Sequence, residues 1–361
     1  MIFKTIILIF ILLFLYILNA FLFPFPKKNV PNGPKPLYGF SYSFENTAWF
    51  GLDPKKTLIE LYDCCKFSWV RLPFYWDTMI DKNGELRIED LEFAITEAKK
   101  RNIKVVVTLG LKTPYYPEFH LPKHIQDQIK FGQIVDINHP VVQDLLKLDQ
   151  KVVLELSRYD NIAYWQVENE PLLANINNIK INPNLIAAEV DLVRKTDPMK
   201  RPIILSHVGP SKFDNNWKML LPILKPGDIL GVNAYFKTQG VNLLAFGLFK
   251  HEFNIPWPNG FVWPVQSWYF LSPNFERLNK LLEERGNSLW VMELQADPYI
   301  RTLSDAKKNS FNFQADDIKK ADIYIKKSRI KSIGFWGSSF WLYREKNGDS
   351  SWMRTVMEIV N

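Results

Sequence analysis

Two glutamates at the ends of apolar, strand-like segments are the residues of this sequence best placed to do chemistry. Glu170 follows the segment IAYWQVE at residues 162–168, and Glu293 lies near the end of LWVMEL at residues 289–294. Hydrolysis of a glycosidic bond requires one protonated carboxyl group for the leaving oxygen and one ionised carboxylate beside the reacting carbon. The two glutamates could meet this requirement only in a fold that brings their strand ends together.

Short apolar segments alternate with longer amphipathic ones from residue 37 onward. The predicted strands are residues 37–42, 69–72, 103–110, 162–168, 202–207, 229–235, 289–294 and 332–337. The segments between them have helical periodicity, and two begin with the Asp53–Pro54 and Asn182–Pro183 pairs that are typical of helix starts. A parallel strand needs a crossover helix before the next one, so this order predicts an α/β fold, a (β/α)8 TIM barrel. The absence of a glycine-rich turn after the first strand disfavours an open doubly wound sheet.

In such a barrel the functional side chains lie at the C-terminal ends of the strands. Besides the two glutamates, these ends carry Arg71, Asn169, His207, Tyr235 and Trp336, with Trp341 close behind. Arg71 would lower the pKa of a neighbouring carboxyl group by opposite charge, whereas burial and like charge would raise the pKa of Glu170. Carboxyl groups with opposite pKa shifts form a working acid/base pair. Glu168 shares the alternation of Glu170, and we expect it to support the site from the barrel interior.

The motif ENEP after the fourth strand and VMEL in the seventh resemble glycoside hydrolase clan A, the cellulase-like barrel hydrolases. The resemblance implies a retaining, metal-independent β-glycoside hydrolase that cleaves a poly- or oligosaccharide by double displacement and needs no cofactor. Glu170 would be the acid/base and Glu293 the nucleophile. Each also has a purely structural interpretation: Glu170 as a helix start, and Glu293 as the ion-pair partner of Arg71.

The resemblance also implies supporting roles for residues at other strand ends. Asn169 would hydrogen-bond the sugar hydroxyl beside the reacting carbon, Arg71 in WVRLPFYW would keep the nucleophile ionised, and Tyr235 in GVNAY would hydrogen-bond it. Trp336 or Trp341 in GFWGSSFW would lie under the sugar.

Two positions depart from the cellulases of the largest family in this group. Those enzymes usually carry a histidine at the end of the third strand and another two residues before the sixth-strand tyrosine, where this chain has GLKTP and Asn233. These two departures argue against membership of that family. His207 is either a polar residue of the site or a locally bonded histidine. The third-strand loop offers further candidate sugar contacts: Lys112, Tyr115, Tyr116, Glu118 and His120.

Composition argues against two other kinds of site, for nucleic acids and for metals, and is compatible with a sugar site. The net charge of +7 comes from scattered lysines and arginines, so no nucleic-acid-binding segment is predicted. Aromatic residues make up 14% of the chain, and such rings commonly form the walls of sugar sites. The five histidines are dispersed, so we predict no metal site. The adjacent Cys64 and Cys65 cannot form an ordinary disulfide on a helix.

The N-terminus predicts attachment to a membrane. Residues 5–23 carry no charge and have the length of a helix that crosses a bilayer. We therefore expect a transmembrane signal anchor at residues 1–25, a Pro- and Lys-rich tether at residues 26–36, and the glycoside hydrolase domain at residues 37–361. A cleaved signal peptide is the alternative, which would make the protein secreted. Because glycans are mostly found outside the cytoplasm, we expect the domain to be extracytoplasmic.

The segment at residues 236–272 is too long for an ordinary connection. Its tryptophans could form a platform for a glycan, its apolar part could dip into a membrane, or the whole could cover the barrel. Two functional alternatives also stay open: a barrel that binds glycans without cleaving them, and a transglycosylase that uses the same two glutamates. The sequence names neither the sugar nor an oligomeric state.

Overall fold

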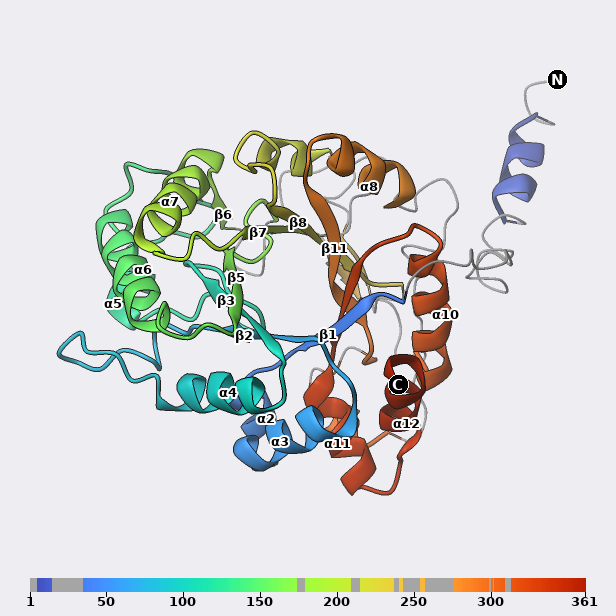
Figure 1. Ribbon diagram of the computed structural model, residues 1–361. Helices are drawn as coiled ribbons and strands as arrows, with labels where there is room; N and C mark the ends of the chain where they lie inside the picture. The colour runs from blue at the N-terminus through green and yellow to red at the C-terminus, as the bar shows by residue number, and fades with distance from the viewer. Residues whose placement is uncertain are drawn as a thin grey trace.

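The computed structural model describes residues 5–14, 35–173, 179–208, 215–236, 240–242, 254–256, 275–298, 300, 302–308 and 313–361. Eight parallel strands form a closed barrel in the order β1-β12-β11-β8-β7-β5-β3-β2 (Figure 1). They are β1 Leu37–Ser41, β2 Trp69–Pro73, β3 Lys104–Leu109, β5 Ile162–Val167, β7 Ile203–His207, β8 Ile229–Ala234, β11 Ser288–Gln295 and β12 Ser332–Trp336. Every predicted strand overlaps one of these, so the predicted (β/α)8 barrel is confirmed.

Helices surround the barrel on its outer side (Figure 1). Those described are α2 Phe44–Trp49, α3 Pro54–Cys64, α4 Glu89–Lys100, α5 Lys123–Gln126, α6 Val142–Leu156, α7 Pro183–Thr196, η1 Asn216–Leu220, α8 Phe275–Glu284, α9 Leu303–Ala306, α10 Ala315–Lys326, α11 Ser338–Lys346 and α12 Ser351–Val360. The two predicted helix starts are confirmed. The side chain of Asp53 accepts a hydrogen bond from the Lys56 amide, and the side chain of Asn182 accepts one from the Asn184 amide. Two short pairs lie outside the barrel: β4 Ile134–Val135 with β6 Lys180–Ile181, and β9 Gly240–Asn242 with β10 Asn254–Pro256.

Trp69, the first residue of β2, fills the interior of the barrel at its N-terminal end. Its indole Nε1 donates to Ser332 Oγ at 2.7 Å, and its ring lies 5.5 Å from that of Trp290. A Cβ at Gly39 would approach the Trp69 ring to 2.2 Å, and one at Gly334 to 2.4 Å. Glycine at both positions therefore makes room for the indole, which provides a packed floor below the C-terminal strand ends.

The N-terminal segment is described only in part. Residues 5–14 are helical and their apolar side chains are exposed. Within the described ranges, we find no helix both long enough and apolar enough to cross a bilayer. The rest of the predicted anchor, and residues 26–34 of the predicted tether, lie outside the described residues. Most of the aromatic segment 236–272 also lies outside them, including Trp257, Trp263 and Trp268.

Candidate active site

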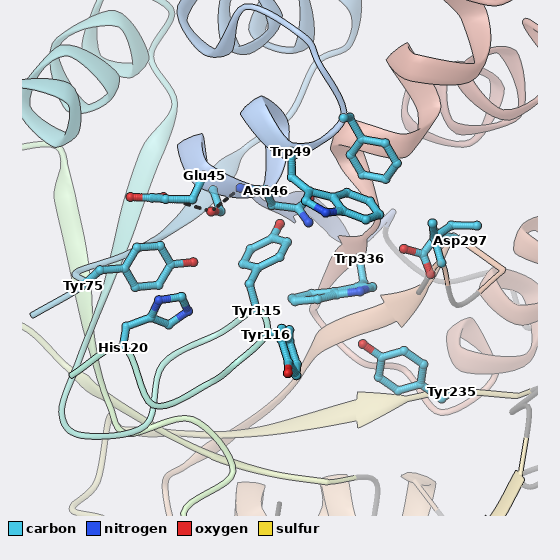
Figure 2. Close-up of a pocket in the computed structure, with 14 residues that line it drawn as sticks. Glu45, Asn46, Trp49, Tyr75, Tyr115, Tyr116, His120, Tyr235, Asp297 and Trp336 are labelled. Atoms are coloured by element: carbon cyan, nitrogen blue, oxygen red, sulfur yellow. Dashed lines mark hydrogen bonds between the residues drawn. The ribbon is translucent and has the colours of Figure 1, made fainter. Parts of the chain in front are cut away.

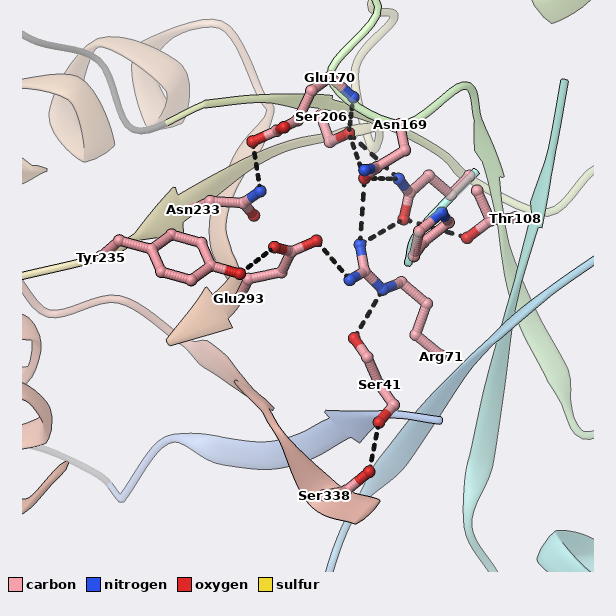
Figure 3. A network of polar contacts seen from close by, with 12 residues as sticks. Ser41, Arg71, Thr108, Asn169, Glu170, Ser206, Asn233, Tyr235, Glu293 and Ser338 are labelled. Atoms are coloured by element: carbon pink, nitrogen blue, oxygen red, sulfur yellow. Dashed lines mark hydrogen bonds and ion pairs between the residues drawn. The ribbon is translucent and has the colours of Figure 1, made fainter. Parts of the chain in front are cut away.

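Glu293 lies in the barrel mouth with both of its carboxylate oxygens bound (Figure 3). Oε1 accepts from Arg71 Nη2 at 2.6 Å, and Oε2 accepts from Tyr235 Oη at 2.6 Å. The pairing register between β11 and β8 shifts between Val291 and Glu293, and such irregularities often redirect a side chain near an active site. The ion pair and the phenol thus fix this carboxylate in one orientation.

Arg71 connects Glu293 to the other side of the barrel. It is fully buried, and its Nε donates to Ser41 Oγ at 2.8 Å. Its Nη1 lies 3.4 Å from both Gln166 Oε1 and Asn169 Oδ1. A buried guanidinium needs such partners, and a buried ion pair of this geometry is strongly destabilised when one member is removed. Sequence reasoning missed Ser41 and Gln166, although each is a polar residue within an apolar strand.

Glu170 lies across the mouth from Glu293, on a turn of unusual backbone geometry. Its φ is +47° and that of Glu168 is +59°, a left-handed conformation that non-glycine residues seldom adopt outside functional sites. The Glu170 amide donates to Ser206 Oγ at 2.9 Å, and Asn233 Nδ2 donates to Glu170 Oε1 at 2.6 Å. Asn233 therefore touches the predicted acid/base directly, a contact that sequence reasoning missed because it treated this position only as a departure from the cellulases.

Burial raises the pKa of Glu170 to about 8, and the negative charge of Glu293 acts in the same direction. The charge of Lys112 and the hydrogen bond from Asn233 lower the pKa in part. At neutral pH this carboxyl group is therefore mainly protonated. A protonated carboxyl group opposite an ion-paired carboxylate is the arrangement that glycoside hydrolysis requires.

Glu168 supports the turn that follows β3. Its Oε1 accepts from the Leu111 amide at 2.8 Å and its Oε2 from the Lys112 amide at 2.7 Å. Gly110 has a φ of +113°, and a Cβ there would come within 2.5 Å of the Glu168 carboxyl carbon. Glycine is required at this position both by the conformation and by the close approach of Glu168.

Lys112 is a buried structural residue, not the exposed sugar contact that the loop sequence suggested. Its Nζ donates to the carbonyl oxygen of Glu170 at 2.9 Å and to that of Leu173 at 3.3 Å, and it pairs with Glu118 at 3.1 Å. Lys112 thus joins the turn after β3 to the turn that carries Glu170.

Asn169 is turned with its oxygen toward Gln166, whose Nε2 donates to Asn169 Oδ1 at 3.2 Å. Because the oxygen also faces Arg71, the amide nitrogen is the end of Asn169 left for other contacts. His207 is buried and its Nδ1 contacts the adjacent carbonyl of Val208, in line with a locally bonded histidine.

A cavity of about 920 Å³ opens next to Tyr235, the partner of Glu293 (Figure 2). Trp336 and Tyr235 form part of its wall, and the ring of Tyr115 stacks on Trp336 with centroids 4.2 Å apart. Trp341 lies elsewhere: it is fully buried in the core and donates its Nε1 to the carbonyl of Ala296 at 2.8 Å. Of the two tryptophans considered as a sugar floor, only Trp336 is placed to contact a ligand, and the alternative of Trp341 is wrong.

Residues 29–228, more than half of the chain, match the family described as cellulase (glycosyl hydrolase family 5). The chain belongs to this family. The inference against membership, drawn from the two sequence departures, was therefore wrong. One of these departures, Asn233, contacts Glu170. No curated protein matches the sequence.

Solved structures share the fold at low sequence identity. The GH5_18 protein from Streptomyces cattleya in complex with GlcNAc has a TM-score of 0.53 and 13% identity, over 84% of this chain and 71% of that chain. An endo-1,4-β-mannanase from Rhizomucor miehei has a TM-score of 0.53 and 11% identity, over 93% and 97%. A β-galactosidase from the psychrophilic Marinomonas ef1 has a TM-score of 0.50 and 14% identity over 82% of this chain and 53% of that chain, so this chain spans about half its length. These likenesses show a shared barrel.

Proposed function

We propose that this cellulase-family protein is a retaining β-glycoside hydrolase that cleaves O-glycosidic bonds of an oligo- or polysaccharide. The observation that carries the proposal is the asymmetry of the two glutamates. Glu293 is held by Arg71 and Tyr235 at 2.6 Å each, whereas the pKa of Glu170 is raised to about 8. One group is thus set up as a nucleophile and the other as a proton donor.

The first step forms a covalent glycosyl-enzyme. A Glu293 oxygen bonds to the anomeric carbon as the bond to the leaving oxygen breaks, and Glu170 gives its proton to that oxygen. In the second step the Glu170 carboxylate takes a proton from water, whose oxygen bonds to the anomeric carbon and releases Glu293. Two inversions give a product of retained configuration.

The surrounding residues hold both carboxyl groups in position. Tyr235 holds the Glu293 oxygen that Arg71 does not, so the carboxylate cannot rotate freely. Asn233 holds Glu170 on the opposite side of the mouth. The amide nitrogen of Asn169 is the donor for the sugar hydroxyl beside the reacting carbon.

Activity of the full chain on chromogenic β-glycosides and polysaccharides tests the proposal, together with Glu170→Gln and Glu293→Gln. These changes keep the size of each side chain and remove its ability to ionise. We expect both variants to lose at least a thousandfold in kcat on the substrate that the wild type cleaves. Glu170→Gln should retain the wild-type melting temperature, whereas Glu293→Gln should lower it, because the buried Arg71 loses its ion-pair partner. Cleavage by both variants at the rate of the wild type would refute the site, and binding without cleavage by the wild type would favour a glycan-binding barrel.

We further propose that the N-terminal segment anchors the hydrolase domain to a membrane, with the domain outside the cytoplasm. Residues 5–23 carry no charge, and Phe10 and Phe14 on the helical part of this segment are 67% and 63% exposed. Membrane fractionation followed by protease treatment of intact cells tests this. We expect the protein in the membrane fraction, cleaved by external protease; recovery in the soluble cytoplasmic fraction would refute it.

A further inference from the structure

The cavity lies on the nucleophile's side of the reaction centre. Neither glutamate is part of its lining, but Tyr235, which binds Glu293, lines it together with Trp336, whereas Asn233, which binds Glu170, does not. The leaving group must lie beside Glu170 and the glycosyl unit beside Glu293. The cavity is therefore the place for the glycon, and its volume of about 920 Å³ is at the upper end of small-molecule sites, large enough for more than one sugar ring.

One wall of this cavity presents two polar atoms that have no hydrogen-bond partner among the described residues. They are His120 Nε2 and Tyr115 Oη, and both are buried. The His120 ring is held by stacking on Tyr75, with centroids 3.7 Å apart (Figure 2). Because an unpaired buried polar atom is costly, these two atoms indicate a ligand that supplies hydrogen bonds.

Glu45 is a carboxylate of the same cavity that lacks a cation. Its Oε2 accepts from Ser43 Oγ at 3.1 Å and its Oε1 from Thr78 Oγ1 at 3.2 Å. No lysine or arginine of the described residues forms an ion pair with Glu45. Burial raises the pKa of this carboxyl group, and the nearby charge of Asp77 acts in the same direction. A cationic group of a ligand would relieve both effects.

The described lining of the cavity contains no lysine or arginine that could pair with Glu45. Asp297 is a second carboxylate of the lining. Arg71 and Lys112, two described cations of the barrel mouth, are fully buried and already paired with Glu293 and Glu118. Burial lowers the pKa of His120, so this ring adds no positive charge at neutral pH. A cationic group of a sugar is therefore favoured next to Glu45, because none of the described lining residues competes for this carboxylate with a positive charge.

Aromatic rings provide the apolar surface that a sugar also needs. Trp49 is 41% exposed and Tyr116 is 78% exposed, and both line the cavity. Trp49 lies on α2, one turn after Glu45, so the same short helix offers a ring and a carboxylate to one ligand (Figure 2).

We propose that this cavity binds a glycon with a free amino group, a 2-amino-2-deoxy sugar unit, and that Glu45 pairs with its ammonium while His120 and Tyr115 bind its hydroxyls. This proposal depends on the proposed hydrolase function for one point only, namely which side of the site holds the glycon.

Calorimetric titration of the catalytically disabled Glu170→Gln full-length protein tests the proposal without relying on turnover. The ligands are the β-1,4-linked disaccharide of glucosamine, its N-acetylated form, and cellobiose. We expect the glucosamine disaccharide to bind about tenfold more tightly than the other two, as a charged hydrogen bond would give. Adding Glu45→Gln should remove this preference and leave cellobiose binding within about twofold.

Glu60→Gln is the matched control, because it removes the same charge from α3 outside the cavity. Equal or weaker binding of the glucosamine disaccharide than of cellobiose, or a preference that survives Glu45→Gln, would overturn the proposal. A loss of preference in Glu60→Gln as well would overturn the assignment to Glu45. Absence of hydrolysis by the wild type with the binding preference intact would count against the proposed function alone.

Discussion

At the scale of single residues, each of the two carboxyl groups proposed as catalytic is controlled by a different kind of neighbour. Glu293 is held by a cation and a phenol, whereas Glu170 is held by an amide nitrogen and is buried. The pattern of strand ends picked out both glutamates together with Arg71 and Tyr235, and the resemblance to clan A implied that these two residues contact Glu293. The sequence could not identify Asn233 as a partner of Glu170, since that contact depends on how β8 faces the turn after β5.

Tyr235→Phe should lower kcat by roughly 10- to 100-fold, because Glu293 loses one of its two fixed contacts but keeps its ion pair with Arg71. Steady-state kinetics on the best substrate measures this. Tyr159→Phe removes a phenol that donates to Glu92 on the outer surface and should leave kcat unchanged. An equal loss of kcat in both variants would mean that the effect of Tyr235→Phe does not arise from its contact with Glu293.

Asn233→Ala should shift the alkaline limb of the pH profile of kcat/KM to higher pH. The wild-type limb is expected near pH 8, where the raised pKa of Glu170 sets the loss of its proton. The hydrogen bond from Asn233 favours the ionised form, so its removal raises the pKa further. A limb that stays in place, or moves to lower pH, would show that Asn233 does not control the proton of Glu170.

At the scale of elements, the barrel strands follow from apolar segments of regular spacing, and the sequence predicted all eight. The turns were harder to predict, because their conformations depend on contacts between different strands. Lys112 looked like an exposed loop residue, yet it is buried since the carbonyls of Glu170 and Leu173 and the carboxylate of Glu118 surround it. Trp341 lies in α11, where the helix turns its side chain into the core.

Gly110→Ala tests the contact between the turn after β3 and Glu168. The new methyl group would meet the Glu168 carboxyl group at 2.5 Å, in a backbone conformation with φ of +113°. We expect a loss of at least about 1 kcal/mol in the free energy of unfolding and a lower kcat, since Glu168 holds this turn. Gly84→Ala is the control, because its φ is +80° and a Cβ there has no close neighbour. Equal losses would assign the effect to φ alone.

The helices α6 and α7 place two further carboxyl groups close to Glu168. Asp149 of α6 and Glu189 of α7 are buried, and burial raises the pKa of both, with the charge of Glu168 adding to the effect. Burial raises the pKa of Glu168 itself to about 7. These groups bind protons in the folded state that the unfolded chain releases near its ordinary carboxyl pKa of about 4. Their contribution to stability is therefore present below about pH 4 and is lost as pH rises through 7 and beyond.

Glu189→Gln should accordingly make the free energy of unfolding less dependent on pH above about 5, and raise it at alkaline pH relative to the wild type. Urea denaturation at a series of pH values measures this. Glu155→Gln changes an exposed residue of α6 and should leave the pH dependence unaltered. The account would be contradicted if the free energy of unfolding of the wild type rose from pH 5 to pH 8 and Glu189→Gln removed that rise.

At the scale of the whole molecule, the barrel brings together residues that are far apart in the chain. The cavity takes its walls from segments after β1, β2, β3, β8, β11 and β12, so no single stretch of sequence shows it. The alternating pattern of strands and helices was enough to predict the barrel and the end at which its chemistry lies. It was not enough to predict that Glu45 and Asp297, from opposite parts of the chain, line the same cavity.

Trapping the covalent intermediate tests the central claim most directly. The Glu170→Gln variant should react with an aryl β-glycoside whose leaving group needs no proton, and then accumulate the glycosyl-enzyme, because no base activates water for the second step. Peptide mass spectrometry should find one added glycosyl unit on Glu293. An adduct on another residue, or unimpaired turnover with no adduct, would contradict the assignment of Glu293 as nucleophile and Glu170 as acid/base.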